Sequence, residues 1–122
     1  SGAEYFWDAR NGGGTWMLSE YNGYDWNWGN VVRFNDSNSY NQWHQFTAVK
    51  NSSVSYLYKN GEQRASGGNV NGTLGNNFRI GTRYTNSSFW NGNISVFRIY
   101  NRALTAEEIS QNFNATRGRF GI

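Results

Sequence analysis

The sequence predicts an all-β fold, namely a two-sheet antiparallel jelly-roll sandwich with one short C-terminal helix. Turn-forming Asn-Gly and Gly-rich clusters recur at intervals of about ten residues, which is the rhythm of a sandwich or barrel. The runs between these turns are short and rich in aromatic residues, a composition that favours strands over helices. A chain of 122 residues has the usual length of one domain, so we expect residues 1–122 to form a single domain.

Short apolar and aromatic runs mark the expected strands. These strands are, in order, residues 5–9, 15–18, 31–34, 43–50, 54–59, 78–81 and 94–100. The chain contains 6 Trp, 8 Tyr and 8 Phe, so rings must supply much of the core, each burying about 150–250 Å². The side chains expected in this core include Trp43, Tyr58, Ile80, Phe97 and Ile99.

The clearest local signal is a hairpin after residues 54–59. Alternating side chains in this run lead into Asn60 and Gly61. An Asn-Gly pair suits the positive φ angles of a type I′ turn, so the strand is predicted to reverse there.

Only one segment has the pattern of a helix, at residues 105–113. Thr105 is followed three residues later by Glu108, which is the spacing of a capping box. Ile109 and Phe113 then follow at helical spacing. The sequence therefore predicts one short helix packed against a sheet.

Composition excludes several classes of chemistry. There is no Cys and only one His. A single chain therefore cannot form a disulfide, a structural Cys-zinc site, a catalytic thiol or a multi-histidine metal centre. The net charge of +3 is spread along the chain without a basic run, and we expect no nucleic acid partner. No apolar run approaches the ~18 residues that span a bilayer, so we expect no membrane insertion.

Motifs in the second half of the chain are typical of a known family. They lie at residues 42–46, 58–61, 78–81, 89–94 and 97–109. In this order and spacing the chain resembles the laminin-G-like branch of the concanavalin A-like lectin/glucanase superfamily, best over residues 42–113. Residues 8–14 and 112–122 are similar to versions of this domain in bacteriophage and other virion structural proteins.

The resemblance implies two curved antiparallel sheets, ligand loops along one rim and often one calcium ion. It implies a lectin-like, non-catalytic module that binds a glycan or a protein surface, outside the cell or on a virion. The alternative is a structural domain of a virion protein, acting as a homo-oligomer or contacting neighbouring subunits. Family members are usually longer, so we expect either a fold without the opening strands or one completed by another chain.

Glycoside hydrolysis is a further alternative, because glucanases belong to the same superfamily. That reaction needs two carboxylates about 5–10 Å apart. No expected strand carries two acids at a spacing of two, and Glu107 and Glu108 suit the start of the predicted helix. The remaining candidates are Glu4 and Asp8, which would face the same side of the first strand. Because no strand has the paired acids of a glucanase, we expect no enzymatic activity.

An aromatic segment at residues 21–30 is the first candidate recognition loop. It mixes rings with short amides and glycines, the composition of adaptable binding loops. The ligand-binding residues expected here are Tyr21, Tyr24, Asp25, Trp26, Asn27 and Trp28. A second candidate surface, at residues 84–90, contributes Tyr84 and Trp90. The alternative is that Trp26 and Trp28, two residues apart, both point into a ring-rich core.

The same segment offers a candidate calcium loop. Asp25, Asn27 and Asp36 stand at the first, third and twelfth positions of such a loop. Asn30 stands at the sixth position, where glycine is expected. One calcium ion is therefore the candidate cofactor.

Overall fold

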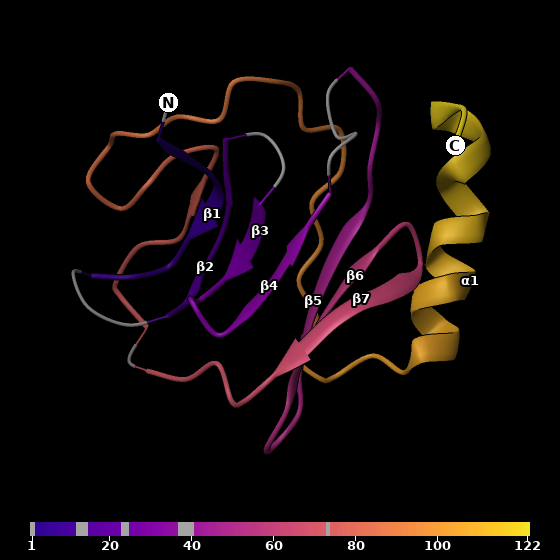
Figure 1. Cartoon of the computed structure of the whole chain (residues 1–122), viewed down its shortest axis with the longest axis horizontal. Coiled ribbons are helices and arrows are strands. Elements are labelled where there is room, and N and C mark those ends of the chain that lie inside the picture. The colour runs from indigo at the N-terminus through magenta and orange to yellow at the C-terminus, as the bar shows by residue number, and fades with distance from the viewer. Residues whose placement is uncertain (1, 12–14, 23–24, 37–40, 73) are drawn as a thin grey trace.

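The computed structural model describes residues 2–11, 15–22, 25–36, 41–72 and 74–122, and it has two antiparallel sheets, as predicted (Figure 1). The strands are β1 (Ala3–Asp8), β2 (Met17–Tyr21), β3 (Asp25–Trp28), β4 (Val32–Asn35), β5 (Phe46–Lys50), β6 (Ser55–Lys59), β7 (Glu62–Gly67) and β8 (Arg79–Ile80). The five-stranded sheet has the order β4-β3-β2-β1-β8, and the three-stranded sheet has the order β5-β6-β7. A helix α1 (Ala106–Thr116) and a 3₁₀ turn η1 (Arg117–Phe120) end the chain.

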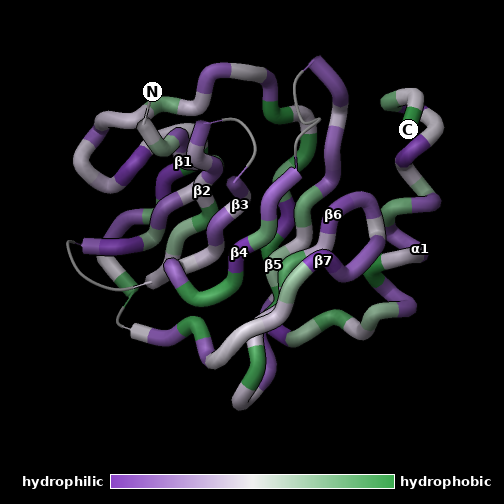
Figure 2. The backbone as a smooth tube through the Cα atoms, in the orientation of Figure 1, coloured by the Kyte–Doolittle hydropathy of each residue, from purple (hydrophilic) through white to green (hydrophobic). Residues whose placement is uncertain are grey.

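The main core lies between the two sheets. In the register of the first sheet, Leu18 pairs with Trp28 and Trp28 with Val32, so these side chains share one face. They pack against Leu57 of the second sheet and Val70. Along the chain, hydrophobic and hydrophilic residues alternate in short runs, as expected for strands with one buried face (Figure 2).

Rings dominate this core, as the composition predicts. Trp26 stacks on Phe6 at 5.1 Å and on Phe46 at 4.0 Å between ring centroids. Phe6 also lies 4.0 Å from the ring of Trp90. Four segments that are distant in sequence are therefore joined by aromatic contacts.

The predicted hairpin between β6 and β7 is confirmed. Asn60 and Gly61 have φ angles of 51° and 77°, the left-handed values that a type I′ turn requires. A Cβ atom on Gly61 would lie 3.1 Å from Cδ2 of Phe113 in α1. Gly61 therefore serves both the turn and the close approach of the helix.

The predicted helix is also confirmed, and it extends three residues beyond residue 113. The Thr105 side chain accepts from the N–H of Glu108, and the Glu108 carboxylate accepts from the N–H of Thr105. Buried Ile109 packs with Val49 and Tyr58 of the three-stranded sheet. None of the helices that the structure describes has the length and apolar character needed to span a membrane.

The helix cap should make stability depend on pH. The Arg102 guanidinium and the N–H of Thr105 lower the pKa of Glu108 from 4.5 to about 2. Because the folded state favours the charged form, this stabilisation is complete above pH 4.5 and is lost as the pH falls toward 2. In urea unfolding at a series of pH values over this window, Glu108→Gln should lose less stability on acidification than the wild type. An equal loss in both proteins would contradict the prediction.

A bulge in β1 changes which side chains face the core. Tyr5 pairs with Ser19 and Trp7 with Leu18, which leaves Phe6 as the extra residue. Phe6 and Trp7 both pack on the core, while Tyr5 and Asp8 lie on the other face of the sheet. The regular alternation of side chains between the two faces of the sheet is therefore interrupted within β1.

The expected strand at residues 94–100 is wrong. In the described structure the main chain of residues 92–104 makes no hydrogen bond, and a strand requires a hydrogen-bonded neighbour. Phe97 and Ile99 were expected in the core, but both are exposed, Ile99 by 71%. Trp43 and Ile80, also expected in the core, are likewise exposed, although the Trp43 ring lies 5.2 Å from the ring of Phe120.

Candidate functional site

The face of the five-stranded sheet that points away from the core is built from polar and aromatic side chains. We call it the outer face. Its register places two cross-strand rows on this side, the first formed by Tyr5, Ser19, Asn27 and Arg33 and the second by Tyr21, Asp25 and Asn35. These residues alternate with the core residues of the same strands, so burial of one face determines the content of the other.

A buried ion pair lies at one end of the outer face, between Asp8 and Arg10. Nε and Nη2 of Arg10 donate to the two carboxylate oxygens of Asp8 at 2.9 and 2.6 Å. The main-chain N–H groups of Arg10 and Tyr84 donate to the same carboxylate at 2.9 and 3.1 Å. The hydrogen bonds that Arg10 donates to Asp8 raise the pKa of Arg10, and four donors hold the fully buried Asp8 carboxylate in place.

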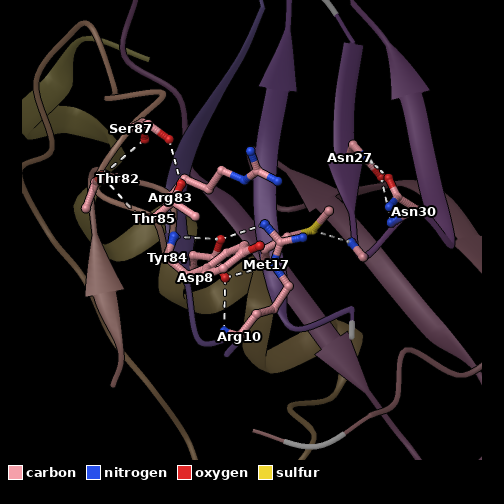
Figure 3. Close-up of polar contacts among 11 residues, drawn as sticks. Asp8, Arg10, Met17, Asn27, Asn30, Thr82, Arg83, Tyr84, Thr85 and Ser87 are labelled. Carbon is pink, nitrogen blue, oxygen red and sulfur yellow. Dashed lines mark hydrogen bonds and ion pairs between the residues drawn. The ribbon is translucent and has the colours of Figure 1, made fainter. Parts of the chain in front are cut away.

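The loop after β8 lies against this ion pair. Arg83 and Tyr84 extend from it across the sheet toward Arg10 (Figure 3). The guanidinium carbons of Arg10 and Arg83 lie 5.1 and 5.2 Å from the ring centroid of Tyr84, and both also lie over the ring of Tyr5. Such cation–π contacts contribute about 0.5–1 kcal/mol each at exposed sites. The loop is thus tied to β1 by charge and by ring contacts.

The other end of the outer face is more open. Arg33 forms an ion pair with Asp25, whose hydrogen bond raises the pKa of the arginine. Beside this pair is a shallow hollow of about 280 Å³, lined by Asp25, Arg33, Phe34 and Asn35. Tyr21, the cross-strand neighbour of Asp25, is 45% exposed. A ring, a carboxylate, a guanidinium and an amide therefore stand together at the surface.

The turn after β3 holds the polar residues of that strand. The Asn27 amide nitrogen donates to Oδ1 of Asn30 at 2.7 Å, and the Asn30 N–H donates back to Oδ1 of Asn27 at 3.0 Å. Gly29 and Asn30 have φ angles of 64° and 60°, which this tight turn requires. The Asn27 side chain is fixed by this reciprocal pair.

Comparison with known families finds a matching family model. A laminin-G family model, described as the concanavalin A-like lectin/glucanases superfamily, matches residues 1–110. The chain belongs to this superfamily. No curated protein matches it in sequence.

Among solved structures, this laminin-G-like chain is similar to a 2.1 Å crystal structure of an S-layer domain-containing protein (residues 221–444) from Clostridium thermocellum ATCC 27405. The two share 17% sequence identity with a TM-score of 0.48. The match covers 92% of this chain and 63% of the other, so the chain spans less than two thirds of that structure. The similarity to virion proteins stays a prediction from the sequence.

In this laminin-G-like chain the predicted binding residues separate into two groups. Tyr21, Asp25 and Asn27 lie on the outer face, and Tyr84 reaches it from its loop. Of the two interpretations left open for the paired tryptophans, the core interpretation is correct. Tyr24 lies outside the described residues.

Three of the predicted binding residues need correction because their rings are committed to packing. Trp26 and Trp28 lie on β3 and are each 2% exposed in the core cluster. Trp90 packs against the same cluster beside Phe6. The rings of Trp26 and Trp28 are not accessible to a ligand, and half-buried Trp90 lies against the core, so none of the three is placed in the candidate site.

The two carboxylates among the proposed calcium ligands form ion pairs with basic side chains from different strands. Asp25 forms its ion pair with Arg33, whereas Asp36 pairs with Lys59 of β6 and lies 3.7 Å from Nη1 of Arg64. Within the described residues there is no group of three or more His, Cys, Asp or Glu side chains that could hold a metal ion. Calcium stays a prediction from the sequence that this arrangement does not favour.

The carboxylates considered for hydrolysis lie differently from their predicted arrangement. Glu4 and Asp8 do not share a face, because the β1 bulge turns Asp8 to the outer side. Glu4 instead pairs across strands with Glu20, on the core-facing side. This carboxylate pair was missed because it joins two strands and not two positions of one strand.

Four residues of the outer face were also missed by sequence reasoning: Tyr5, Arg10, Arg33 and Arg83. The ion pair of Arg33 with Asp25 depends on the register between β3 and β4. Arg83 contacts Tyr5 of β1 from a loop that is distant in sequence. Only the Asp8-x-Arg10 spacing was visible locally, and the bulge that turns it to the outer face was not.

Proposed function

We propose that this chain is a non-catalytic recognition module that binds a glycan across the outer face of the five-stranded sheet. The contacts would come from Tyr21, Asp25, Arg33 and Asn35 at the open end, and an extended glycan would reach Tyr84 toward the Asp8–Arg10 end. We further propose that it acts outside the cell, where laminin-G-like modules meet glycans and surfaces.

The observation that carries this proposal is the exposed Tyr21 ring beside the Asp25–Arg33 pair and the hollow of about 280 Å³. Sugar sites combine a flat apolar surface with a few fixed polar groups that bind hydroxyls. Tyr21 offers the ring, and the ion pair holds its carboxylate and guanidinium in fixed positions. The hollow is slightly below the range of roughly 300–1,000 Å³ typical of small-molecule sites, so it suits one or two sugar units.

Removal of the exposed ring tests this site. On a glycan array, the wild type should bind a defined set of glycans, and Tyr21→Ala should bind them at least about fivefold more weakly, because a stacked ring contributes ~1 kcal/mol or more. The matched control is Tyr100→Ala, since Tyr100 is 46% exposed but lies outside the outer face. Equal losses in the two variants, or none in Tyr21→Ala, would remove Tyr21 from the site.

We propose that the Glu4–Glu20 pair is not catalytic. Glu20 is only 5% exposed and lies opposite Trp26 in the sheet, so its side chain is shielded from a sugar. The Oε2 atom of Glu4 already accepts the N–H of Asn91 at 3.0 Å. Incubation with β-glucans should therefore release no reducing sugar. Release that is abolished by Glu4→Gln would show the chain to be a glycosidase.

A further inference from the structure

A large apolar groove lies apart from the proposed glycan site and shares no lining residue with it. Its volume is about 740 Å³, and it is lined by β5, the helix α1 and residues 93–104. Most of the exposed large apolar side chains of the described residues lie along it, including Trp43, Phe78 and five side chains of residues 94–100. A concentrated apolar surface of this kind marks an interaction site.

One wall of the groove carries unpaired main-chain groups. Across the described structure, residues 92–104 make no main-chain hydrogen bond, although residues 94–100 are rich in β-branched and aromatic side chains. This segment passes behind β5 in Figure 1. Among the described strands, β5 pairs only with β6, so its other edge is open, and it also lines the groove. Open edges of this kind accept an added strand.

The charge of the lining is positive. The groove is lined by Lys50, Arg98, Arg102 and Arg117, and no Asp or Glu side chain lines it. Arg102 is paired with Glu108, but Lys50 and Arg98 make no ion pair with any described residue. An acidic occupant would therefore be favoured over a neutral or basic one.

We propose that this groove binds an extended polypeptide segment with apolar and acidic side chains, which adds as a β-strand to the main chain of residues 94–100. The unpaired N–H and C=O groups would hold its backbone, and the exposed rings would hold its apolar side chains. Lys50 and Arg98, which form no ion pair with a described residue, would bind its carboxylates. An acyl chain would leave the main-chain groups unused. A second copy pairing through the same segment would bring a second Arg98 into a groove that is already positive.

The probe is a capped synthetic peptide of about nine residues in which Val and Phe alternate with Thr and Glu. It should bind the whole chain and slow amide hydrogen exchange at alternate residues of 94–100. The same peptide with N-methylated amides, which cannot complete the strand pairing, should bind at least about tenfold more weakly. The peptide with Gln in place of Glu should also bind more weakly, with less dependence on salt.

Paired variants at adjacent positions keep the test independent of folding. Main-chain N–H groups alternate in direction along a strand, so either Ile99→Pro or Tyr100→Pro should weaken peptide binding relative to Thr at the same position. Both side chains are exposed and neither N–H is bonded in the free chain, so melting temperatures should stay close to that of the wild type. Glycan binding by all four variants should be unchanged, which separates this proposal from the proposed function.

Several results would overturn the proposal. Equal binding of the N-methylated peptide, or exchange at residues 94–100 that the peptide does not slow, would exclude strand addition. Tighter binding of sodium myristate than of the peptide would assign the groove to an acyl chain. Dimerisation in sedimentation equilibrium that protects the same amides without peptide would assign it to a second copy.

Discussion

Trp26→Ala is expected to lower the free energy of unfolding by about 3–5 kcal/mol, the usual cost of truncating a large buried ring. Trp26 is 2% exposed and stacks on both Phe6 and Phe46, which belong to different sheets. The loss should appear in urea unfolding as a lower midpoint with an unchanged slope.

The control for this prediction is Tyr21→Ala, because Tyr21 belongs to the same segment, residues 21–30, but lies at the surface. Tyr21 is exposed, so its truncation should change stability by about 0.5 kcal/mol or less. If Trp26→Ala kept wild-type stability and lost glycan binding per folded molecule, Trp26 would belong to a surface loop and the core described above would be wrong.

Asp8→Ala should have a comparable effect, about 3–5 kcal/mol, through charge and not through packing. The substitution leaves the buried Arg10 guanidinium without its carboxylate and the Tyr84 N–H without its acceptor. Removal of one partner of a buried ion pair is costly because the other charge stays buried and unpaired.

A double variant separates this cause from general damage. Asp8→Ala combined with Arg10→Met removes both charges, so it should regain part of the lost stability in thermal and urea unfolding. If the double variant were less stable than the sum of the two single variants, the Asp8–Arg10 pair would not be the source of the effect.

Local signals predicted those parts of the fold that local chemistry determines. The turn at Asn60 and Gly61 and the capping box at Thr105 and Glu108 depend on residues within four positions, and both are confirmed. The two-sheet class followed from the spacing of turns and from the family motifs. These features need no knowledge of which strands are neighbours.

The site could not be predicted as well, because its geometry depends on partners that are distant in sequence. The segment 21–30 reads as a loop, but pairing with β2 and β4 makes Asp25–Trp28 a strand and sends Trp26 and Trp28 inward. Asn27 and Asp25 face outward for the same reason. The bulge at Phe6, which turns Asp8 toward Arg10, has no signal in composition or alternation.

The apolar run at residues 94–100 shows the opposite failure. Its composition is that of a core strand, yet no described strand pairs with it, so Ile99 stands exposed. A sequence pattern reports the capacity to form a strand, whereas the strand itself needs a partner edge. We infer that this partner is supplied by another polypeptide.

A glycan is expected to bind across the outer face of the five-stranded sheet. The most direct measurement is amide chemical-shift mapping on the isotope-labelled chain, titrated with the tightest glycan from the array. The largest shifts should fall on Tyr21, Asp25, Arg33, Asn35 and Tyr84, with little change in residues 94–100. Shifts confined to the apolar groove lined by β5, α1 and residues 93–104, with none on the outer face, would contradict glycan binding at the outer face.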